Sequence, residues 1–317
     1  LTYHQLTREE RYFISTRLRS GASMRMIARE MGRSASTISR EVARNATRHD
    51  GAYRPSKAQQ YAQARRRRCR RWSLFNADDW AYIHALLRKK WSPEQIAGAL
   101  RMRSELAISY RTIYRHILRD RRLGGTLWRH TRIMSKFARK RYRSIDHRGV
   151  MPGKRHISER PREVESRQRI GHWEGDTVIG SDKHHCVLTL VERKTGMAIV
   201  KKLTSRSMAE VNEAAIMAIS EHRQRFKTIT FDNGTEFHDY QVIEQTHPVK
   251  CYFATPYHSW ERGSNENFNG LLRQYFPKGM CMSKITQKEC DEVARELNMR
   301  PRKRLGFKSP HWAYHHG

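Results

Sequence analysis

The sequence contains no run of about 18 apolar residues, the length that a membrane-spanning helix requires. The first ten residues, LTYHQLTREE, contain no apolar signal-peptide core. None of the five cysteines stands in a CxxC pair, which argues against a disulfide framework and against a cysteine-rich zinc site. These three absences favour a cytoplasmic protein with no membrane partner.

Acidic residues are also scarce, since 31 Asp and Glu stand against 63 Lys and Arg and leave a net charge of +32. Up to Ser166 the count is 40 basic against 14 acidic residues, a net of +26, and the remainder is 23 against 17, a net of +6. A charge of this size favours a polyanionic partner, most commonly nucleic acid. We therefore expect nucleic acid as partner and the cytoplasm or the nucleoid as location. The 317 residues allow two or three domains.

Residues 1–50 predict three short helices with a DNA-binding arrangement. A T-x-x-E capping box opens the first helix at Thr7, and serines precede the other two. The spacing of Ala28, Gly32 and Ile38 resembles the helix-turn-helix signature, in which a small residue, a turn glycine and an aliphatic anchor pack two helices closely. The alternative is a three-helix domain with a solvated basic face. The open face of the third helix gives four candidate DNA contacts: Ser36, Thr37, Arg40 and Arg44.

Residues 51–121 predict a basic helix and a second, looser helix-turn-helix. The arginine run from Arg65 to Arg71 fits a basic helix, a minor-groove arm or a solvated linker, and the sequence does not choose. The next segment, SPEQIAGAL, has a serine N-cap followed by proline, and ISYRTIYRHIL again begins a helix at a serine. Arg111 and Arg115 on this last helix are candidate DNA contacts. Residues 122–166 contain scattered Arg, Gly and Pro with little periodicity, and we expect a basic linker that can order on DNA.

From residue 167 onward the sequence shows strand and helix patterns, and residues 167–317 predict an α/β domain with a mixed sheet. Three successive strands form an antiparallel meander, an amphipathic helix follows, and two further strands complete the sheet. In such a sheet an aspartate within the first strand and one at the end of the fourth can lie side by side. Asp176 and Asp232 have these positions. The segments are GHWEGDTVIG, HHCVLTLVERKTG, MAIVKKLTS, MAEVNEAAIMAISEHR, TITF and KCYFATPY.

A third carboxylate, Glu266, follows Asp232 after 33 intervening residues, on a helix that comes after the last strand. Arg273 lies seven residues, or two turns, further along the same helix face, and we expect it to contact the scissile phosphate or the flanking DNA. Two neighbours, Glu174 and Glu261, are rival ligands. The simpler interpretation of Asp232 is that it caps the turn formed by the following Asn-Gly.

The order and spacing of Asp176, Asp232 and Glu266 resemble the acidic triad of the retroviral-integrase and transposase superfamily, which has an RNase H-like fold. The phrases GHWEGDTV, TFDNGTEF, ERGSNENFNGLLRQYFPKG and LNMRPRKRLGFKSP, with the N-terminal SxSTISRE, resemble the IS30 family of bacterial insertion-sequence transposases. These motifs span about half of the chain. The resemblance implies an all-α helix-turn-helix region followed by an α/β catalytic core.

The resemblance also implies a function. The triad would be catalytic and would hold two Mg²⁺ ions, for which Mn²⁺ can substitute, and hydrolysis at the ends of a mobile element would precede strand transfer. The helix-turn-helix units would bind the terminal inverted repeats, and a homodimer or higher oligomer would join two ends. Two other functions stay open: a DNA-binding regulator with an inactive integrase-like dimerisation domain, and an RNase H-type nuclease.

Overall fold

The computed structural model describes residues 4–47, 49–68, 74–132, 153–256 and 258–317. The chain forms two compact units, residues 1–76 and residues 77–317, and each is described by itself. In the described ranges no helix is both long and apolar enough to cross a bilayer.

The first unit contains the three predicted helices and a fourth. Thr7 and Glu10 form the expected capping box, and Ser23 and Ser34 cap the second and third helices. Gly32 has a φ of +61°, a left-handed conformation that allows the sharp turn between the second and third helices. Ile14, Ile27 and Ile38 are fully buried among these helices. The helices are α1 (Arg8–Arg19), α2 (Met24–Glu30), α3 (Ala35–Asn45) and α4 (Pro55–Arg68).

The second unit begins with three α-helices and a 3₁₀ turn, which we call the helical layer. Ser92 and Gln95 form a capping box with proline at the first helical position, as the sequence predicted, and Ser109 caps the last of the three α-helices. A loop of seven residues, 103–109, separates these two capped helices, in agreement with the looser helix-turn-helix that the sequence predicted. The helices are α5 (Ala77–Arg88), α6 (Pro93–Met102), α7 (Tyr110–Arg122) and the 3₁₀ turn η1 (Leu127–His130).

A five-stranded sheet of order β3-β2-β1-β4-β5 forms the centre of the rest of this unit. The first three strands pair antiparallel, which confirms the predicted meander, whereas β4 pairs parallel with both β1 and β5. The sheet is therefore mixed, as expected. Its strands are β1 (His172–Ile179), β2 (Cys186–Glu192), β3 (Ala198–Leu203), β4 (Thr228–Phe231) and β5 (Lys250–Phe253).

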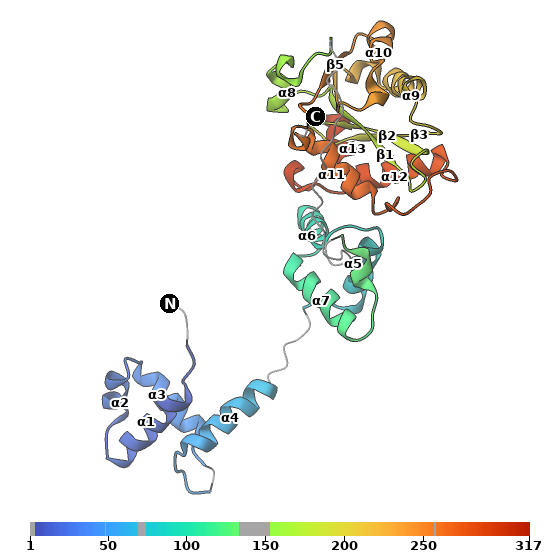
Figure 1. The fold of residues 1–317 in the computed structure, drawn as a ribbon. Helices are drawn as coiled ribbons and strands as arrows, with labels where there is room; N and C mark the ends of the chain where they lie inside the picture. Colours follow the sequence, from blue (N-terminus) through green and yellow to red (C-terminus); the bar gives the residue numbers. More distant parts are fainter. Residues whose placement is uncertain (1–3, 48, 69–73, 133–152, 257) are drawn as a thin grey trace. The chain divides into compact units, whose positions relative to one another are not determined.

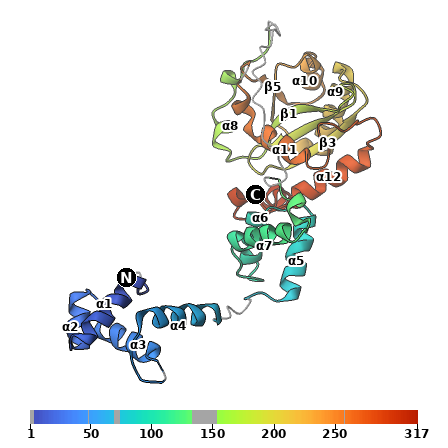
Figure 2. The same ribbon diagram turned by 60° about the horizontal axis from the view of Figure 1, so that its bottom comes forward.

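Helices cover both faces of the sheet, with α9 and α10 on one side and α11 and α12 on the other (Figures 1 and 2). Alternation along β2 fills both cores, since Leu188 and Leu190 pack toward α9 while Val187 and Val191 pack toward α11 and α12. The helices are α8 (Glu163–Ser166), α9 (Met208–Glu221), α10 (Gln241–Thr246), α11 (Gly263–Leu272), α12 (Gln287–Met299) and α13 (Pro310–His316), and the 3₁₀ turns are η2 (Ile157–Glu159), η3 (Arg223–Arg225), η4 (Thr235–Phe237), η5 (Ser259–Arg262) and η6 (Lys303–Leu305).

Residues 153–166, which the sequence assigned to the linker, pack on the sheet. His156 forms a parallel bridge with Phe253, and the buried guanidinium of Arg160 donates to the hydroxyl of Thr230 at 2.9 Å. The ordered core thus starts before residue 167 in this structure. Residues 133–152 of the expected linker lie outside the described ranges.

Helix α6 packs on a turn near the C-terminus of the core. Lys303 pairs with Glu94 at 2.8 Å, and the side-chain amide of Gln95 donates to the carbonyl of Pro301 at 2.9 Å. At Gly98 the ring of Phe307 lies so close to the backbone that a Cβ atom would stand 2.1 Å from a ring carbon. The glycine is therefore needed for this close approach.

We expect Gly98→Ala to destabilise the second unit by about 1–3 kcal/mol, because overpacking outweighs the gain of about 1 kcal/mol that alanine brings to a helix. Urea denaturation of the full chain measures this. Gly263→Ala is the matched control, because it is also at a helical position and no described atom outside its neighbours lies within 4 Å of the added Cβ. Equal stability of Gly98→Ala and wild type would contradict the close contact.

Candidate active site and nucleic-acid interface

The parallel pairing of β1 with β4 places two carboxylates at adjacent positions. Glu174 is the partner of Thr230 in this ladder. Asp176 and Asp232 each follow that pair by two residues, so the same register, continued past the end of β4, sets them opposite one another. The expectation that these aspartates lie side by side agrees with this geometry.

The guanidinium of Arg262 lies between the two aspartates. Its Nη1 is 3.6 Å from Oδ1 of Asp176, and its Nη2 is 3.4 Å from Oδ2 of Asp232. Nη1 also donates to the carbonyl of Gly175 at 3.1 Å. The Arg262 side chain is only 13% exposed, so this cation compensates the repulsion between two partly buried carboxylates.

Burial dominates the electrostatics of Asp176, whose side chain is 22% exposed. Desolvation is the main cause that raises the pKa of Asp176 to about 6; the pairing with Arg262 opposes the rise and the charge of Asp232 contributes to it. Its Oδ2 accepts a hydrogen bond of 2.8 Å from the side-chain amide of Asn269, which fixes the orientation of the carboxylate. Arg262 thus offsets the burial of this carboxylate only in part.

Asp232 also forms the turn that its sequence suggested. Its Oδ1 accepts a hydrogen bond of 2.8 Å from the backbone N–H of Gly234, and a Cβ at Gly234 would meet Oε2 of Glu236 at 2.5 Å. The turn holds one carboxylate oxygen, and Oδ2 is directed to Arg262. The capping interpretation and the site interpretation are compatible at this residue.

Glu266 lies in the first turn of α11 with an exposed side chain. Positions 266, 269 and 273 are spaced by three and four residues and therefore share one face of α11 and its C-cap, while Arg262 lies in the 3₁₀ turn directly before the helix. The other three residues contact β1 or its end: Arg262 at Gly175 and Asp176, Asn269 at Asp176, and Arg273 at Ile179. Glu266 thus lies on the same helix face as Asn269, the residue that contacts Asp176.

The described carboxylates are not arranged as a complete metal site. In the part of the chain that the structure describes, no three His, Cys, Asp or Glu side chains are close enough together to hold a metal ion. The donor set nevertheless suits a hard divalent cation, because Asp176 and Asp232 present oxygens on either side of a position that a cationic group occupies.

The two rival carboxylates have structural partners. Glu174 is fully buried, pairs with Arg193 at 2.7 Å and accepts from the backbone N–H of Asn265 at 2.9 Å. Glu261 accepts hydrogen bonds from the backbone and hydroxyl of Thr255 at 2.7 and 3.0 Å. Glu174 thus ties β1 to the start of α11, and Glu261 orders the preceding turn.

Arg273 caps the end of α11 and is directed to the backbone. Its Nη2 donates to the carbonyl of Ile179 at 2.9 Å and its Nη1 to that of Phe276 at 3.4 Å, while burial lowers its pKa. These contacts hold α11 on the end of β1. The contact of Arg273 with DNA stays a prediction.

Three polar residues near the carboxylates were missed in the sequence: Arg262, Asn269 and Glu236. Arg262 stands four residues before Glu266 and Asn269 three residues after it, so positions about one helical turn from Glu266 would have found them. Buried Glu236 accepts from the hydroxyl of Thr177 and pairs with Arg206, both at 2.6 Å. Its only sequence signal is its place four residues after Asp232.

The predicted DNA-reading face of α3 is largely solvent-accessible. Ser36, Arg40 and Arg44 are exposed, whereas Thr37 is half-buried and its hydroxyl lies 2.8 Å from that of Ser34. Arg40 donates to the carbonyl and hydroxyl of Ser36, both at 3.0 Å, which holds the guanidinium along the helix. Such an arrangement presents donors to a groove.

Helix α4 adds cations to this face. Arg65 donates to the carbonyl of Arg44 at 3.2 Å, and Arg65 and Arg66 line a hollow of about 390 Å³ together with Arg40 and Arg44. Arg65 to Arg68 therefore belong to a helix, so the basic-helix interpretation holds for that part of the arginine run. Residues 69–73 lie outside the described ranges. In the second unit, Arg111 and Arg115 are both exposed on α7.

Two domain families match the sequence. Residues 2–45 match a helix-turn-helix domain, and residues 166–259 match an integrase core domain. The chain is thus a protein with an N-terminal DNA-binding domain and an integrase-type core.

Its relatives are transposases. The chain is 40% identical over 305 residues to the transposase for insertion sequence element IS4351 of Bacteroides fragilis, covering 96% of this chain and 94% of the relative. It is 38% identical over 323 residues to transposase InsI for IS30A of Escherichia coli (strain K12), covering 96% and 82%. It is 35% identical to the transposase for IS1086 of Cupriavidus metallidurans, covering 97% and 93%. The chain belongs to the IS30 family of insertion-sequence transposases.

Solved integrases show a more distant likeness. A simian T-cell lymphotropic virus intasome aligns with 54% of this chain and 61% of its own at 19% identity and a TM-score of 0.41. The HTLV-2 integrase catalytic core domain in complex with magnesium aligns with 46% of this chain and 96% of its own at 22% identity and a TM-score of 0.35.

We expect Asp176→Asn to be more stable than wild type at pH 7 without metal, by on the order of 1 kcal/mol. The folded carboxyl, with its pKa raised from 3.8 to about 6, binds a proton more tightly than the unfolded one. Stability is therefore lost as pH rises from about 4 to about 6, and the amide removes that loss. Urea unfolding with a chelator at pH 4 and pH 7 measures both values. A variant that is less stable than wild type at pH 7 would contradict this account.

Proposed function

We propose that this protein binds the terminal inverted repeats of an insertion sequence and catalyses metal-dependent strand cleavage and strand transfer. The observation that carries the proposal is the pairing of Asp176 with Asp232 around a cationic group, in a chain of the IS30 transposase family. The exposed basic face of α3 supports the assignment of double-stranded DNA as partner.

Asp176, Asp232 and Glu266 would hold two Mg²⁺ ions, or Mn²⁺ in their place. Such ions activate the attacking water or 3′-hydroxyl and stabilise the departing oxygen of an in-line phosphoryl transfer. The chain's own residues prepare the site. Asn269 orients the Asp176 carboxylate, and the turn at Gly234 fixes Asp232.

Arg262 has a distinct part in this proposal. Its guanidinium neutralises the two aspartates in the free protein. Metal ions held by the aspartates would compete with Arg262 for the same oxygens, and a displaced Arg262 would be placed to pair with a DNA phosphate. Glu266, exposed near the start of α11, would supply the third carboxylate.

DNA joining requires two element ends, and we propose that a homodimer or a higher oligomer brings them together. The helix-turn-helix face reads the end sequence through Ser36, Thr37, Arg40 and Arg44, and Arg111 and Arg115 of α7 extend the contact. Arg273 stands at the end of α11, beside the flanking DNA.

The triad is tested by three near-isosteric variants: Asp176→Asn, Asp232→Asn and Glu266→Gln. Each removes one ligand charge with little change in volume, so we expect folding and DNA binding to persist while Mg²⁺-dependent nicking falls by several orders of magnitude. A gel of nicking and strand-transfer products on DNA carrying the element's own ends measures this.

Glu261→Gln is the control for that series, because Glu261 belongs to the same motif but bonds to Thr255. It should cut at nearly the wild-type rate. Glu174→Gln is unsuitable as a control, since that carboxylate is buried on Arg193. Normal cutting by all three triad variants would refute these carboxylates as the catalytic centre, and no metal-dependent cutting by wild type would favour the regulator. Loss of activity in Glu261→Gln together with normal cutting by Glu266→Gln would move the third ligand to Glu261.

We expect Arg40→Ala to weaken specific binding of element ends by about 1–3 kcal/mol if its guanidinium reads a base, and to leave cleavage of docked ends possible. Footprinting over the terminal repeat measures the loss. Arg19→Ala is the matched control, because Arg19 is an exposed arginine at the far end of α1. An unchanged footprint with Arg40→Ala would show that α3 is not the reading helix.

A further inference from the structure

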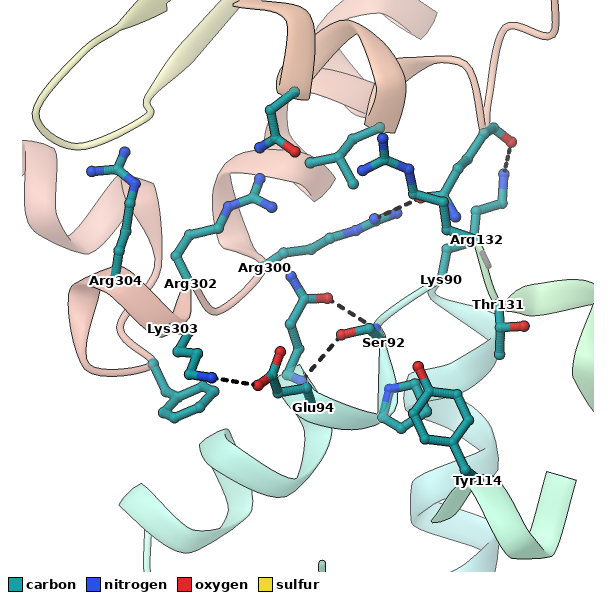
Figure 3. Close-up of a pocket in the computed structure, with 16 residues that line it drawn as sticks. Lys90, Ser92, Glu94, Tyr114, Thr131, Arg132, Arg300, Arg302, Lys303 and Arg304 are labelled. Carbon is teal, nitrogen blue, oxygen red and sulfur yellow. Dashed lines mark hydrogen bonds and ion pairs between the residues drawn. The ribbon is translucent and has the colours of Figure 1, made fainter. Parts of the chain in front are cut away.

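A cavity of about 560 Å³ lies between α6 and the C-terminal segment of the core. Figure 3 shows its two walls: Lys90, Ser92 and Glu94 come from the helical layer, and Arg300, Arg302, Lys303 and Arg304 come from the segment that follows α12. Asn267 and Leu271 of α11 complete the lining. The cavity therefore borders the helix that carries Glu266.

The lining of this cavity is strongly cationic. Six of its residues are basic and one, Glu94, is acidic, and Glu94 is paired with Lys303 at 2.8 Å. Three of the other cations donate to backbone carbonyls, which supply no neutralising charge: Lys90 to Gln274, Arg302 to Leu297 and Arg304 to Lys194. The six basic residues are Lys90, Arg132, Arg300, Arg302, Lys303 and Arg304.

The cations of the C-terminal segment are costly to hold together. Arg300 is 1% exposed, and its Nε has no hydrogen-bond partner among the described residues. Burial, together with the charges of Arg300 and Arg304, lowers the pKa of Arg302 to about 10. Lys303 and Arg304 are exposed, so the excess positive charge of the lining is open to an incoming anion.

We infer that this cavity binds a backbone phosphate of double-stranded DNA, an inference that rests on the proposed function. Three features favour DNA over a small free anion. The cationic charge exceeds that of one phosphate, α6 belongs to the helix pair whose α7 exposes Arg111 and Arg115, and α11 links the cavity to Glu266. The cavity thus borders α6 and α7 as well as α11, the helix that carries Glu266.

A phosphate held there anchors the DNA duplex on both walls of the cavity at once. Arg302 and Arg304 approach it from the core, and Lys90 approaches it from the helical layer. Because both walls contribute, DNA binding strengthens the contact between α6 and the core, which Phe307 and Gly98 already form. The same contact fixes the distance between the bound duplex and the carboxylates.

The test uses the full chain, a fluorescently labelled DNA duplex and anisotropy titrations at several salt concentrations. Arg302→Gln and Lys90→Gln should each bind several-fold more weakly, with a salt slope shallower by about 0.9, the value for one lost phosphate contact. Glu94→Gln should bind more tightly, since it removes the acid that neutralises Lys303. Arg295→Gln, an exposed position on α12, is the charge-matched control and should keep the wild-type slope.

Thermal melting shows whether each variant folds, and if Arg302→Gln does not, Lys90→Gln and Glu94→Gln decide the outcome. Wild-type affinity and slope in those two folded variants would overturn the inference while leaving the transposase assignment intact. A second arm adds inorganic phosphate: stabilisation of wild type but not of Arg302→Gln, with unchanged DNA slopes, would assign the cavity to a free anion and refute the DNA contact. Absence of any DNA binding by wild type would refute the proposed function itself.

Discussion

The arrangement of the catalytic core depends on one electrostatic constraint, the placement of two partly buried carboxylates side by side on adjacent parallel strands. Asp176 and Asp232 would repel one another strongly in this environment without a cation. Arg262 supplies that cation from the turn before α11, and Asn269 holds one carboxylate from the same helix. The position of α11 over β1, and with it the position of Glu266, follows from these contacts.

The cavity beside α6, in the same unit, shows the corresponding constraint with positive charge in place of negative charge. Around this cavity, four arginines and two lysines stand against Glu94, the one acidic residue among the described residues that line it. Both places carry an excess of one charge, so each favours a ligand of the opposite sign. A metal cation suits the first and a phosphate suits the second. These are the two charged partners that a phosphoryl transfer on DNA brings together.

Most of the local structure could be read from the sequence, because caps and periodicity act over a few residues. Thr7, Ser34, Ser92 and Ser109 all begin helices where their motifs predicted, and the alternating strands form the expected meander. The packing of residues 153–166 on the sheet could not be read in this way. Their bridge and hydrogen bonds involve Phe253 and Thr230, which lie far away in the sequence.

The sequence by itself determined the charge imbalance, the helix starts, the strand pattern and the choice of Asp176, Asp232 and Glu266 as candidates, since these depend on residue type and short-range spacing. Only the tertiary structure decided which groups face them. The parallel register of β1 and β4 sets Asp176 opposite Asp232, and the docking of α11 brings Arg262 between them while Glu174 is buried on Arg193. Such choices depend on distances between residues 19 to 86 positions apart in the sequence, and those distances exist only once the sheet and its covering helices have packed.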